Sequence, residues 1–432
     1  MVDEGLDGWR LARFRDFLKE SRLAGSSGGV AQKLTVRLYG KGVVAKVNDR
    51  GGSSATKYYK RRQGQLIFSK LDFLNGAFGL VPPELDGYES TLDLPCFDIA
   101  PDVDPAWLLS VLIRPAFYRR YRGMAIGSRK AQRVPVEEFL ASVVTTPPTE
   151  EQQRISRSLA AVDAAIDGTD QFVAELRRSK FWLMRELLTK GNAKHKTKLV
   201  PLPESWPIGR IASLVDRMPL HWKLVTLTKI AKLESGHTPS RKEPDYWNGD
   251  IPWLSLPDSY RLNEIEVNDA DGRISPLGIA NSSARMLPVG SVLLIRTGGS
   301  RGKCSRLAAT MACSQDYVAF VPEPELDSRY LQQVFRHMQR EWQRLSDGST
   351  TLRNIFMHAF KRLKILLPPL DEQAAIADVG EAFDLRITAE VRYLEQLRQT
   401  KRGLAQGLLS GRVRVRARKT NGARASGAVR GR

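Results

Sequence analysis

Two long stretches of the chain place apolar residues at alternating spacings of four and three positions. The first stretch covers residues 147–191 and the second covers residues 367–411. An apolar period of 3.5 residues, sustained over several heptads, is typical of a coiled-coil seam. We therefore predict two long helices that pack against each other. The apolar seam positions are Ile155, Leu159, Val162, Ile166, Val173, Leu176, Leu183 and Leu187 in the first stretch, and Ile376, Phe383, Ile387, Leu394, Leu397, Leu404 and Leu408 in the second.

Both stretches are bounded by residues that delimit helices. Pro147-Pro148 and Pro368-Pro369 cannot continue a helix upstream, so each helix is expected to start just after its proline pair. Gly191 and Gly411 are suitable stop signals at the other ends.

The second half of the chain repeats the first at an offset of 221 residues. Pro-Pro-Thr-Glu-Glu-Gln at 147–152 returns as Pro-Pro-Leu-Asp-Glu-Gln at 368–373. The ungapped alignment also pairs Asp163 with Asp384 and Lys180 with Lys401. A long internal repeat indicates two equivalent modules in tandem. If the two helices run antiparallel, we expect a globular module at each end of a rigid rod and a pseudo-two-fold axis between them.

The repeat extends weakly into the regions between the helices. Residues 64–70 resemble residues 290–296, and Phe97 resembles Phe320, whereas the intervening loops differ strongly. A shared scaffold with divergent loops is expected where loops carry specificity.

Each globular region is predicted to be mixed α/β. Strands are expected at 65–69, 291–295 and 317–321, and short helices at 105–118 and 327–344. The expected fold class is thus α/β (α+β), with two globular modules separated by two long antiparallel helices. The predicted order is module one at 1–146, a helical region at 147–191, module two at 192–366, a helical region at 367–411 and a basic disordered tail at 412–432.

The charge of the chain points to a polyanionic partner. It carries 67 Lys and Arg against 47 Asp and Glu, a net charge of +20. Such an excess is most often found in proteins that bind nucleic acid. No signal peptide is visible and no apolar run approaches the length of a membrane span, so we expect a soluble, cytoplasmic protein associated with DNA.

Motifs for catalysis are weak or missing. The segment 297–304 resembles a phosphate loop, but Thr297 occupies the position of the first Gly, and Cys304 replaces the residue that would hold magnesium. The five His and three Cys lack the spacings of metal ligands or of a disulfide framework. We expect no catalytic residue, no metal site and no cofactor in this chain.

These motifs together resemble the specificity subunit of a type I restriction-modification system. The resemblance rests on the two Pro-Pro…Glu-Gln segments, on Ser-Gly-His-Thr-Pro-Ser at 235–240, on Tyr246-Trp247 and on Ile-Pro-Trp-Leu at 251–254. It covers nearly the whole chain, although module one lacks the Gly-Xaa-Thr-Pro-Ser opening.

The resemblance implies a noncatalytic subunit whose two modules are target-recognition domains. Each would read one half of a bipartite site in double-stranded DNA, while the coiled coil sets the spacing and docks methylation subunits, expected to number two. Restriction subunits would join through the methylation subunits. The assembled complex would be a DNA adenine methyltransferase and ATP-dependent endonuclease. Its S-adenosylmethionine, ATP and magnesium would be bound by the partner subunits.

Candidate DNA contacts are Arg, Lys, hydroxyl and amide side chains near turn-forming loops, since these groups suit phosphates and base edges. In module one they are Lys57, Tyr59, Lys60, Arg61, Arg62, Ser69, Lys70, Ser128, Arg129, Lys130 and Arg133. In module two they are Thr238, Ser240, Arg241, Lys242, Thr297, Ser300, Arg301, Lys303, Thr350, Thr351, Arg353 and Asn354. Trp247 and Trp253 are expected in the core rather than stacked on bases.

Two alternatives remain open on the sequence. The chain could be a free-standing coiled-coil DNA-binding regulator, or the specificity part of a single-chain restriction-modification enzyme. Methyl transfer by the chain alone would favour the enzyme, and binding to one contiguous site without partners would favour the regulator.

Overall fold

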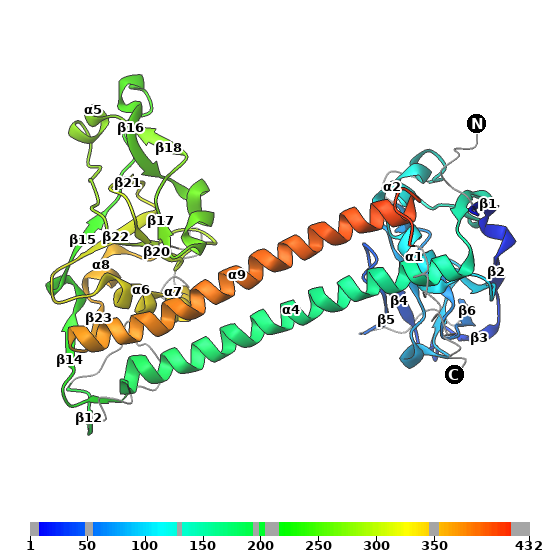
Figure 1. Cartoon of the computed structure of the whole chain (residues 1–432), viewed down its shortest axis with the longest axis horizontal. Helices are drawn as coiled ribbons and strands as arrows, with labels where there is room; N and C mark the ends of the chain where they lie inside the picture. The colour runs from blue at the N-terminus through cyan, green and yellow to red at the C-terminus, as the bar shows by residue number, and fades with distance from the viewer. Residues whose placement is uncertain are drawn as a thin grey trace, which may run out of the picture. The chain divides into compact units, whose positions relative to one another are not determined.

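The structure is a computed structural model that describes residues 8–47, 55–127, 132–192, 198–203, 216–344 and 354–415. The chain forms two compact units. Unit 1 consists of Met1–Asp167 and Glu395–Arg432, and unit 2 of Gly168–Leu394. Both contain helices and strands, which confirms the predicted mixed α/β class with two globular modules (Figure 1). In the part of the chain that the structure describes, no helix has the length and apolar character needed to cross a membrane.

The two predicted long helices are present. Helix α4 spans Thr149–Lys190 and helix α9 spans Leu370–Leu409 (Figure 1). Each begins at the residue directly after its proline pair. Gly191 and Gly411 follow the helix ends with φ angles of 80° and 75°, a left-handed conformation that glycine adopts without steric cost. The proline pairs and glycines therefore delimit the helices as predicted.

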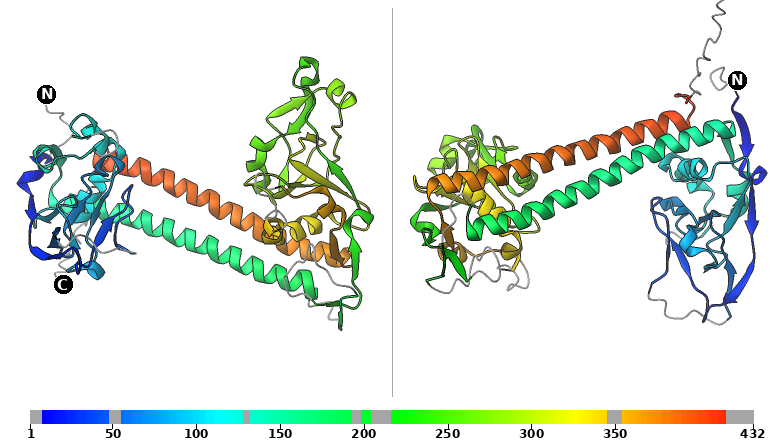
Figure 2. Two further views of the ribbon diagram at one scale, coloured as in Figure 1. Left: turned by 180° about the vertical axis from the view of Figure 1, so that it is seen from behind. Right: turned by 60° about the horizontal axis from the view of Figure 1, so that its bottom comes forward.

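The two helices pair in an antiparallel manner within each unit. In unit 2 the end of α4 lies beside the start of α9 (Figure 2). There Lys180 forms an ion pair of 2.5 Å with Asp384. In unit 1 the start of α4 meets the end of α9, where Lys401 forms an ion pair with Asp163. The repeat thus places the same lysine–aspartate contact in both units.

Most predicted seam residues are buried or half-buried, but Leu183 is an exception. Its side chain is 40% exposed, whereas Met184 and Leu188 are buried in the core of module two beside Trp222. A straight α-helix repeats every 3.6 residues and drifts away from a strict heptad. The apolar face at the end of α4 therefore continues through Met184 and Leu188, and Leu183 is not part of the seam.

Module one is built on a four-stranded antiparallel sheet in the order β2-β10-β7-β8. Its strands are β2 (Leu18–Ser21), β10 (Cys96–Ile99), β7 (Leu66–Phe68) and β8 (Phe78–Leu80). A cluster of aromatic residues fills the core, and Ile155 and Leu159 of α4 join it together with Leu408 of α9. The sheet is therefore anchored directly to both helices within unit 1.

The other strands and α-helices of unit 1 lie outside this sheet. They are the strands β1 (Arg10–Arg13), β3 (Ala24–Ser27), β4 (Leu34–Val36), β5 (Val43–Ala45), β6 (Lys57–Lys60), β9 (Glu89–Ser90) and β11 (Val143–Thr146), with the helices α1 (Pro105–Leu112), α2 (Pro115–Tyr118) and α3 (Val136–Ala141). The helix predicted at 105–118 is broken before Pro115, because proline cannot donate the hydrogen bond that a helix interior requires.

Module two is built on a five-stranded sheet in the order β15-β22-β19-β20-β17. Its strands are β15 (Ala231–Ser235), β22 (Tyr317–Pro322), β19 (Val292–Ile295), β20 (Cys304–Leu307) and β17 (Glu266–Val267). A second sheet has the order β18-β16-β21, formed by β18 (Gly272–Ile274), β16 (Trp247–Leu254) and β21 (Ala312–Cys313). Helix α6 (Ser328–His337) is buried against the main sheet and is followed by α7 (Gln339–Arg344).

The remaining elements of unit 2 frame these sheets. They are the strands β12 (Leu199–Pro201), β13 (Arg217–Pro219), β14 (Lys223–Thr226) and β23 (Lys364–Leu367), with the helices α5 (Pro276–Ala280) and α8 (Met357–Lys361). The strands predicted around 65–69, 291–295 and 317–321 correspond to β7, β19 and β22.

Candidate nucleic-acid interface

Two loops predicted to contact DNA in module two lie at one end of the five-stranded sheet. Strands β15 and β19 both run antiparallel to β22, with Ser235 opposite Val318 and Ile295 opposite Tyr317. The C-terminal ends of β15 and β19 therefore lie beside the start of β22. This end of the sheet, where β15 and β19 finish, is called the edge of the module below. It carries loop 236–242, loop 296–303 and turn 314–316.

Turn 314–316 holds the two loops together. The Thr238 hydroxyl donates to Gln315 Oε1 at 2.6 Å, and the Thr297 hydroxyl donates to Asp316 Oδ1 at 2.7 Å. Ser314 Oγ donates to the other Asp316 oxygen at 3.0 Å. The two predicted threonines thus order the loops, and the exposed Gln315 lies between them.

An aromatic pair supports loop 236–242 from below. Trp253 Nε1 donates to the His237 carbonyl and Trp247 Nε1 to the Ser240 carbonyl, each at 3.0 Å. Trp253 is buried in the core as predicted, whereas Trp247 is half-buried. The exposed Arg241 guanidinium lies 4.2 Å from the Trp247 ring centroid, a cation–π contact that restricts this long side chain.

Loop 296–303 is similarly fixed by hydrogen bonds. The Gly302 N–H donates to the Ile295 carbonyl at 2.7 Å, and Gln339 Nε2 donates to the Arg301 carbonyl at 3.2 Å. Ser300, Arg301 and Lys303 are half-buried on this loop, while Ser240 and Lys242 are exposed on the neighbouring one.

Asn354 lies at the same edge, because the Ile355 N–H that follows it donates to the Arg296 carbonyl at 2.8 Å. Thr350, Thr351 and Arg353 lie outside the described residues.

Module one forms the equivalent edge with the same backbone bonds. The Lys70 N–H donates to the Asp93 carbonyl at 2.9 Å, as Arg296 N–H does to Asp316 at 2.9 Å. The Val134 N–H donates to the Lys70 carbonyl at 3.2 Å, matching the bond from Ile355 to Arg296. Lys70 and Arg133 therefore lie at the module-one counterpart of the edge that carries loop 296–303.

The carboxylate of Asp93 is used differently from that of Asp316. Arg133 Nε lies 3.1 Å from Asp93 Oδ1, so the ion pair orients an exposed arginine at this edge. Ser128, Arg129 and Lys130 lie outside the described residues.

The structure corrects two predicted contacts in module one. Arg61 is fully buried, and its guanidinium donates to Ser90 Oγ at 2.7 Å, to the Ser21 carbonyl at 2.9 Å and to the Leu94 carbonyl at 3.2 Å. Burial lowers the pKa of Arg61. Ser69 is also buried, and its hydroxyl accepts the Asp72 N–H at 3.0 Å. Both side chains are structural, because neither is accessible to DNA.

The neighbours of Arg61 lie on or beside a different sheet from Lys70. Lys57, Tyr59 and Lys60 belong to β6, which pairs with β3 and β9. Lys57, Lys60 and Arg62 are exposed, and Tyr59 is half-buried with its ring 5.7 Å from the Arg61 guanidinium. These cations remain predicted contacts on a second surface of module one.

Sequence reasoning missed the acidic and amide residues that organise the two edges. Asp93 and Asp316 are separated by 223 residues, the same offset that relates Phe97 to Phe320. This match indicates that the two positions are equivalent, but a carboxylate is not a group that suits phosphates, so neither aspartate was predicted as a contact. No sequence feature of Gln315 predicts its role, apart from its position next to Asp316.

The repeated glutamate anchors a tryptophan in each unit. Glu151 Oε2 accepts from Trp9 Nε1 at 3.0 Å, and Glu372 Oε2 accepts from Trp222 Nε1 at 2.9 Å. Burial opposes the charge on Glu151, but hydrogen bonds from Arg414 and Trp9 hold its pKa below the ordinary value.

The repeated glutamine connects each module to its helix. Gln152 accepts the Asp104 N–H at 2.8 Å and donates to the Pro147 carbonyl at 2.8 Å. Gln373 makes the same two bonds, to the Asp327 N–H and to the Pro368 carbonyl, also at 2.8 Å. The Glu-Gln repeat is therefore the structural link between a module and the start of a long helix.

Known proteins share both the sequence and this fold. Residues 219–399 match the family described as the type I restriction modification DNA specificity domain. The MjaIX specificity subunit of Methanocaldococcus jannaschii is 26% identical over 174 residues, which is 39% of either chain. A putative type I MjaX specificity subunit of the same organism is 23% identical over 63% of this chain and 60% of its own. These alignments thus cover less than two thirds of each relative.

Solved structures extend the likeness in fold. A chain from a structure of a type I restriction-modification system, concerned with its assembly and conformational transition, aligns with a TM-score of 0.55 and 18% identity. The alignment covers 93% of this chain and 98% of that one. The type I S subunit of M. genitalium aligns with a TM-score of 0.53 and 11% identity, over 94% of this chain and 97% of that one.

Residues 219–399 are accordingly similar to the DNA specificity domain of type I restriction-modification systems. The whole chain has the fold of the specificity subunits of these systems, which confirms the predicted resemblance.

Proposed function

We propose that the chain is the DNA-specificity subunit of a type I restriction-modification complex, in which each module reads one half of a bipartite target. The observation that carries this proposal is the duplicated edge. Lys70–Asp93–Val134 and Arg296–Asp316–Ile355 make the same backbone bonds at the end of equivalent sheets. A protein with two equivalent surfaces and different loops on each is suited to reading two different half-sites.

The charge of the chain supports double-stranded DNA as the ligand. The net charge of +20 favours a polyanion. Exposed Arg241 and Arg133, each held by a specific contact, suit phosphates or guanine edges because a restrained guanidinium loses less entropy on binding. The contacts of Lys57, Lys60, Arg62, Ser240 and Lys242 belong to the same proposal.

We further propose that two methylation subunits bind the helical region and that restriction subunits join through them. A tandem repeat with matching ion pairs in both units offers two equivalent docking positions. Methyl transfer, ATP hydrolysis and DNA cleavage would then be carried out by these partners, with their own S-adenosylmethionine, ATP and magnesium.

The alternatives of a free-standing regulator and of a single-chain enzyme are not favoured. Structural matches to type I system chains cover more than nine tenths of this chain.

The direct test is long-read detection of methylated bases in cells with and without this gene, together with the methylation subunits. The proposal expects methylation at a two-part, asymmetric sequence that disappears when the gene is removed. Methylation that persists without the gene, or that marks one contiguous site, would contradict it.

A further inference from the structure

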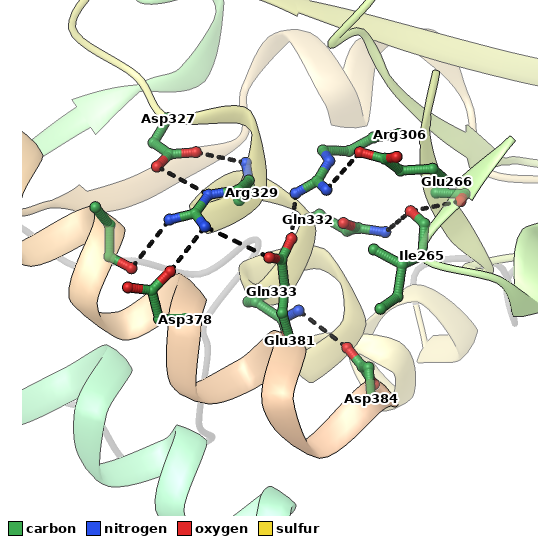
Figure 3. Close-up of polar contacts among 12 residues, drawn as sticks. Ile265, Glu266, Arg306, Asp327, Arg329, Gln332, Gln333, Asp378, Glu381 and Asp384 are labelled. Atoms are coloured by element: carbon green, nitrogen blue, oxygen red, sulfur yellow. Dashed lines mark hydrogen bonds and ion pairs between the residues drawn. The ribbon is translucent and has the colours of Figure 1, made fainter. Parts of the chain in front are cut away.

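Module two is held to helix α9 by ion pairs that converge on Glu381 (Figure 3). Arg306 lies on β20 and is buried between two carboxylates. Its Nη2 lies 2.8 Å from Glu266 Oε1 of β17, and its Nη1 is paired with Glu381 Oε1 of α9. The sheet of module two is thus tied to the long helix through a guanidinium that is shielded from water.

A second arginine reaches the same carboxylate from helix α6. Arg329 Nη1 lies 2.7 Å from Asp378 Oδ1 and 3.5 Å from Glu381 Oε2. Its Nη2 donates to the Ala374 carbonyl of α9 at 3.3 Å. We call Arg306, Arg329, Asp378 and Glu381 the ionic clamp. It joins one strand and one helix of module two to successive turns of α9.

Polar packing continues one turn further along α9. Gln333 Nε2 donates to Asp384 Oδ2 at 3.0 Å, as Figure 3 shows, and Arg336 Nη1 lies 2.7 Å from the same oxygen. Gly380 leaves room for this contact, because a Cβ at that position would lie 2.5 Å from Gln333 Cδ. The face of α9 toward module two is therefore shaped for polar side chains.

In the described part of unit 1, helix α1 and the corresponding turns of α4 carry no equivalent of the clamp. At the offset of 221 residues, Asp378 and Glu381 correspond to Arg157 and Ala160, and Gly380 corresponds to Leu159. Leu159 is buried in the apolar core of module one. Helix α1, the counterpart of α6, carries no charged residue. Both contacts share the Glu-Gln links and apolar packing, but at these turns of the helix only unit 2 adds the ionic clamp.

We propose that the ionic clamp fixes the orientation of module two on α9 and thereby limits the half-site spacing that the chain accepts. Glu381 and Arg306 are then positioning residues for recognition of the second half-site. This inference rests on the proposed function. Guanidinium–carboxylate bonds are directional, whereas apolar side chains tolerate small shifts and repacking. Loss of the clamp would leave module two attached through its apolar contacts but free to rotate slightly.

Three variants of the full chain separate this role from simple stability. Glu381→Lys places a cation between two arginines, and Glu381→Gln removes the charge while keeping the shape. Glu381→Asp keeps the charge. A matched control is Glu390→Gln, because Glu390 pairs with Arg386 at 2.6 Å on α9 away from the clamp.

The first readout needs no partner or DNA. Hydrogen exchange of the full chain is expected to speed up in α6 and β20 for Glu381→Lys and Glu381→Gln, and to stay unchanged for Glu390→Gln. Unchanged exchange at α6 in both clamp variants would overturn the inference, whatever the chain does with DNA.

The second readout uses the complex with its methylation subunits and duplexes whose half-sites are moved apart or together by one base pair. The wild-type complex is expected to bind duplexes of one spacing about tenfold or more tightly than the others, a difference of about 1.4 kcal/mol in binding free energy. Glu381→Lys and Glu381→Gln are expected to reduce this preference several-fold. Glu381→Asp should restore the preference, and binding to the second half-site alone should be retained.

Undiminished spacing preference in Glu381→Lys and Glu381→Gln would overturn the inference, as would loss of binding to the second half-site alone. If the wild-type complex binds no bipartite duplex, the proposed function and the effect on spacing are both refuted. The hydrogen-exchange measurement still shows whether the clamp holds module two on α9.

Discussion

Lys180 of α4 forms an ion pair of 2.5 Å with Asp384 of α9, and the repeat forms the same pair again between Lys401 and Asp163. The two pairs differ in their surroundings. Lys180 and Asp384 are 14% and 13% exposed, whereas Lys401 and Asp163 are 35% and 46% exposed. Both pairs interrupt an apolar seam with a charged contact, and such contacts can specify helix register and orientation.

The difference in burial predicts unequal costs for the same substitution. Asp384→Asn leaves Lys180 and Arg336, whose side chains are only 14% and 17% exposed, without their shared carboxylate and should cost about 3 kcal/mol of stability. Asp163→Asn removes a half-exposed partner and should cost about 1 kcal/mol or less. Denaturation midpoints of the two full-length variants test this. Equal shifts would mean that burial does not decide the worth of these pairs.

The buried Glu372 predicts acid sensitivity of unit 2. Its carboxylate accepts hydrogen bonds from Trp222 Nε1 and the Asn192 N–H, both at 2.9 Å, and lies 2.8 Å from His221 Nε2. Burial opposes the charge, but these groups outweigh it and hold the pKa below the ordinary 4.5. Its stabilising contribution is therefore complete above pH 4.5 and is lost as the pH falls through the lower folded value.

Glu372→Gln should flatten the fall of the thermal midpoint on acidification below pH 4.5, because the neutral side chain has no proton to gain. The exposed Glu395 on the same helix offers a matched control, Glu395→Gln. A variant that keeps the full acid dependence of wild type would show that Glu372 is not the group responsible.

Arg61 and Arg62 are adjacent in sequence, but their substitution is expected to affect stability and DNA binding differently. Arg61→Met leaves the Ser21 and Leu94 carbonyls without their donor and should cost about 2–4 kcal/mol of stability. Arg62 is exposed, so Arg62→Ala should change stability by less than about 0.5 kcal/mol. If Arg62 contacts a phosphate, its removal should also reduce the salt dependence of DNA binding by about 0.9 in the log–log slope. An Arg61→Met protein as stable as wild type would contradict the structural role.

Gln315 is expected to contact the second half-site. It is exposed at the turn between loops 236–242 and 296–303, and Thr238 orients its amide at 2.6 Å. Gln315→Ala should weaken binding by about tenfold or more, the usual scale for a lost base-edge contact, without moving the denaturation midpoint. Gln399→Ala on the exposed face of α9 is the control. If both variants bind alike, Gln315 does not touch DNA.

Local patterns predicted the long helices well because prolines, glycines and heptads act within a few residues of each other. Pro148 and Gly191 delimit α4 as the sequence indicated. The prediction that Leu183 lies in the seam is wrong, because the buried face at the end of α4 follows the core of module two rather than the heptad. Here the side chains of Met184 and Leu188 settle which face is buried.

The predicted contact loops were harder to assess, because exposure depends on distant parts of the chain. Arg61 sits in a basic run that suggests a surface, yet carbonyls from Ser21 and Leu94 enclose it. Loops 236–242 and 296–303 lie together because β15 and β19 both pair with β22. This pairing cannot be predicted from the spacing of residues along the chain.

In the proposed function each module reads its own half-site. The most direct measurement exchanges residues 1–145 for the corresponding module of another specificity subunit and maps methylated bases by long-read sequencing, with the original methylation subunits present. If the modules act separately, one half of the methylated target changes while the other half stays the same. A target that changes in both halves, or in neither, would contradict it.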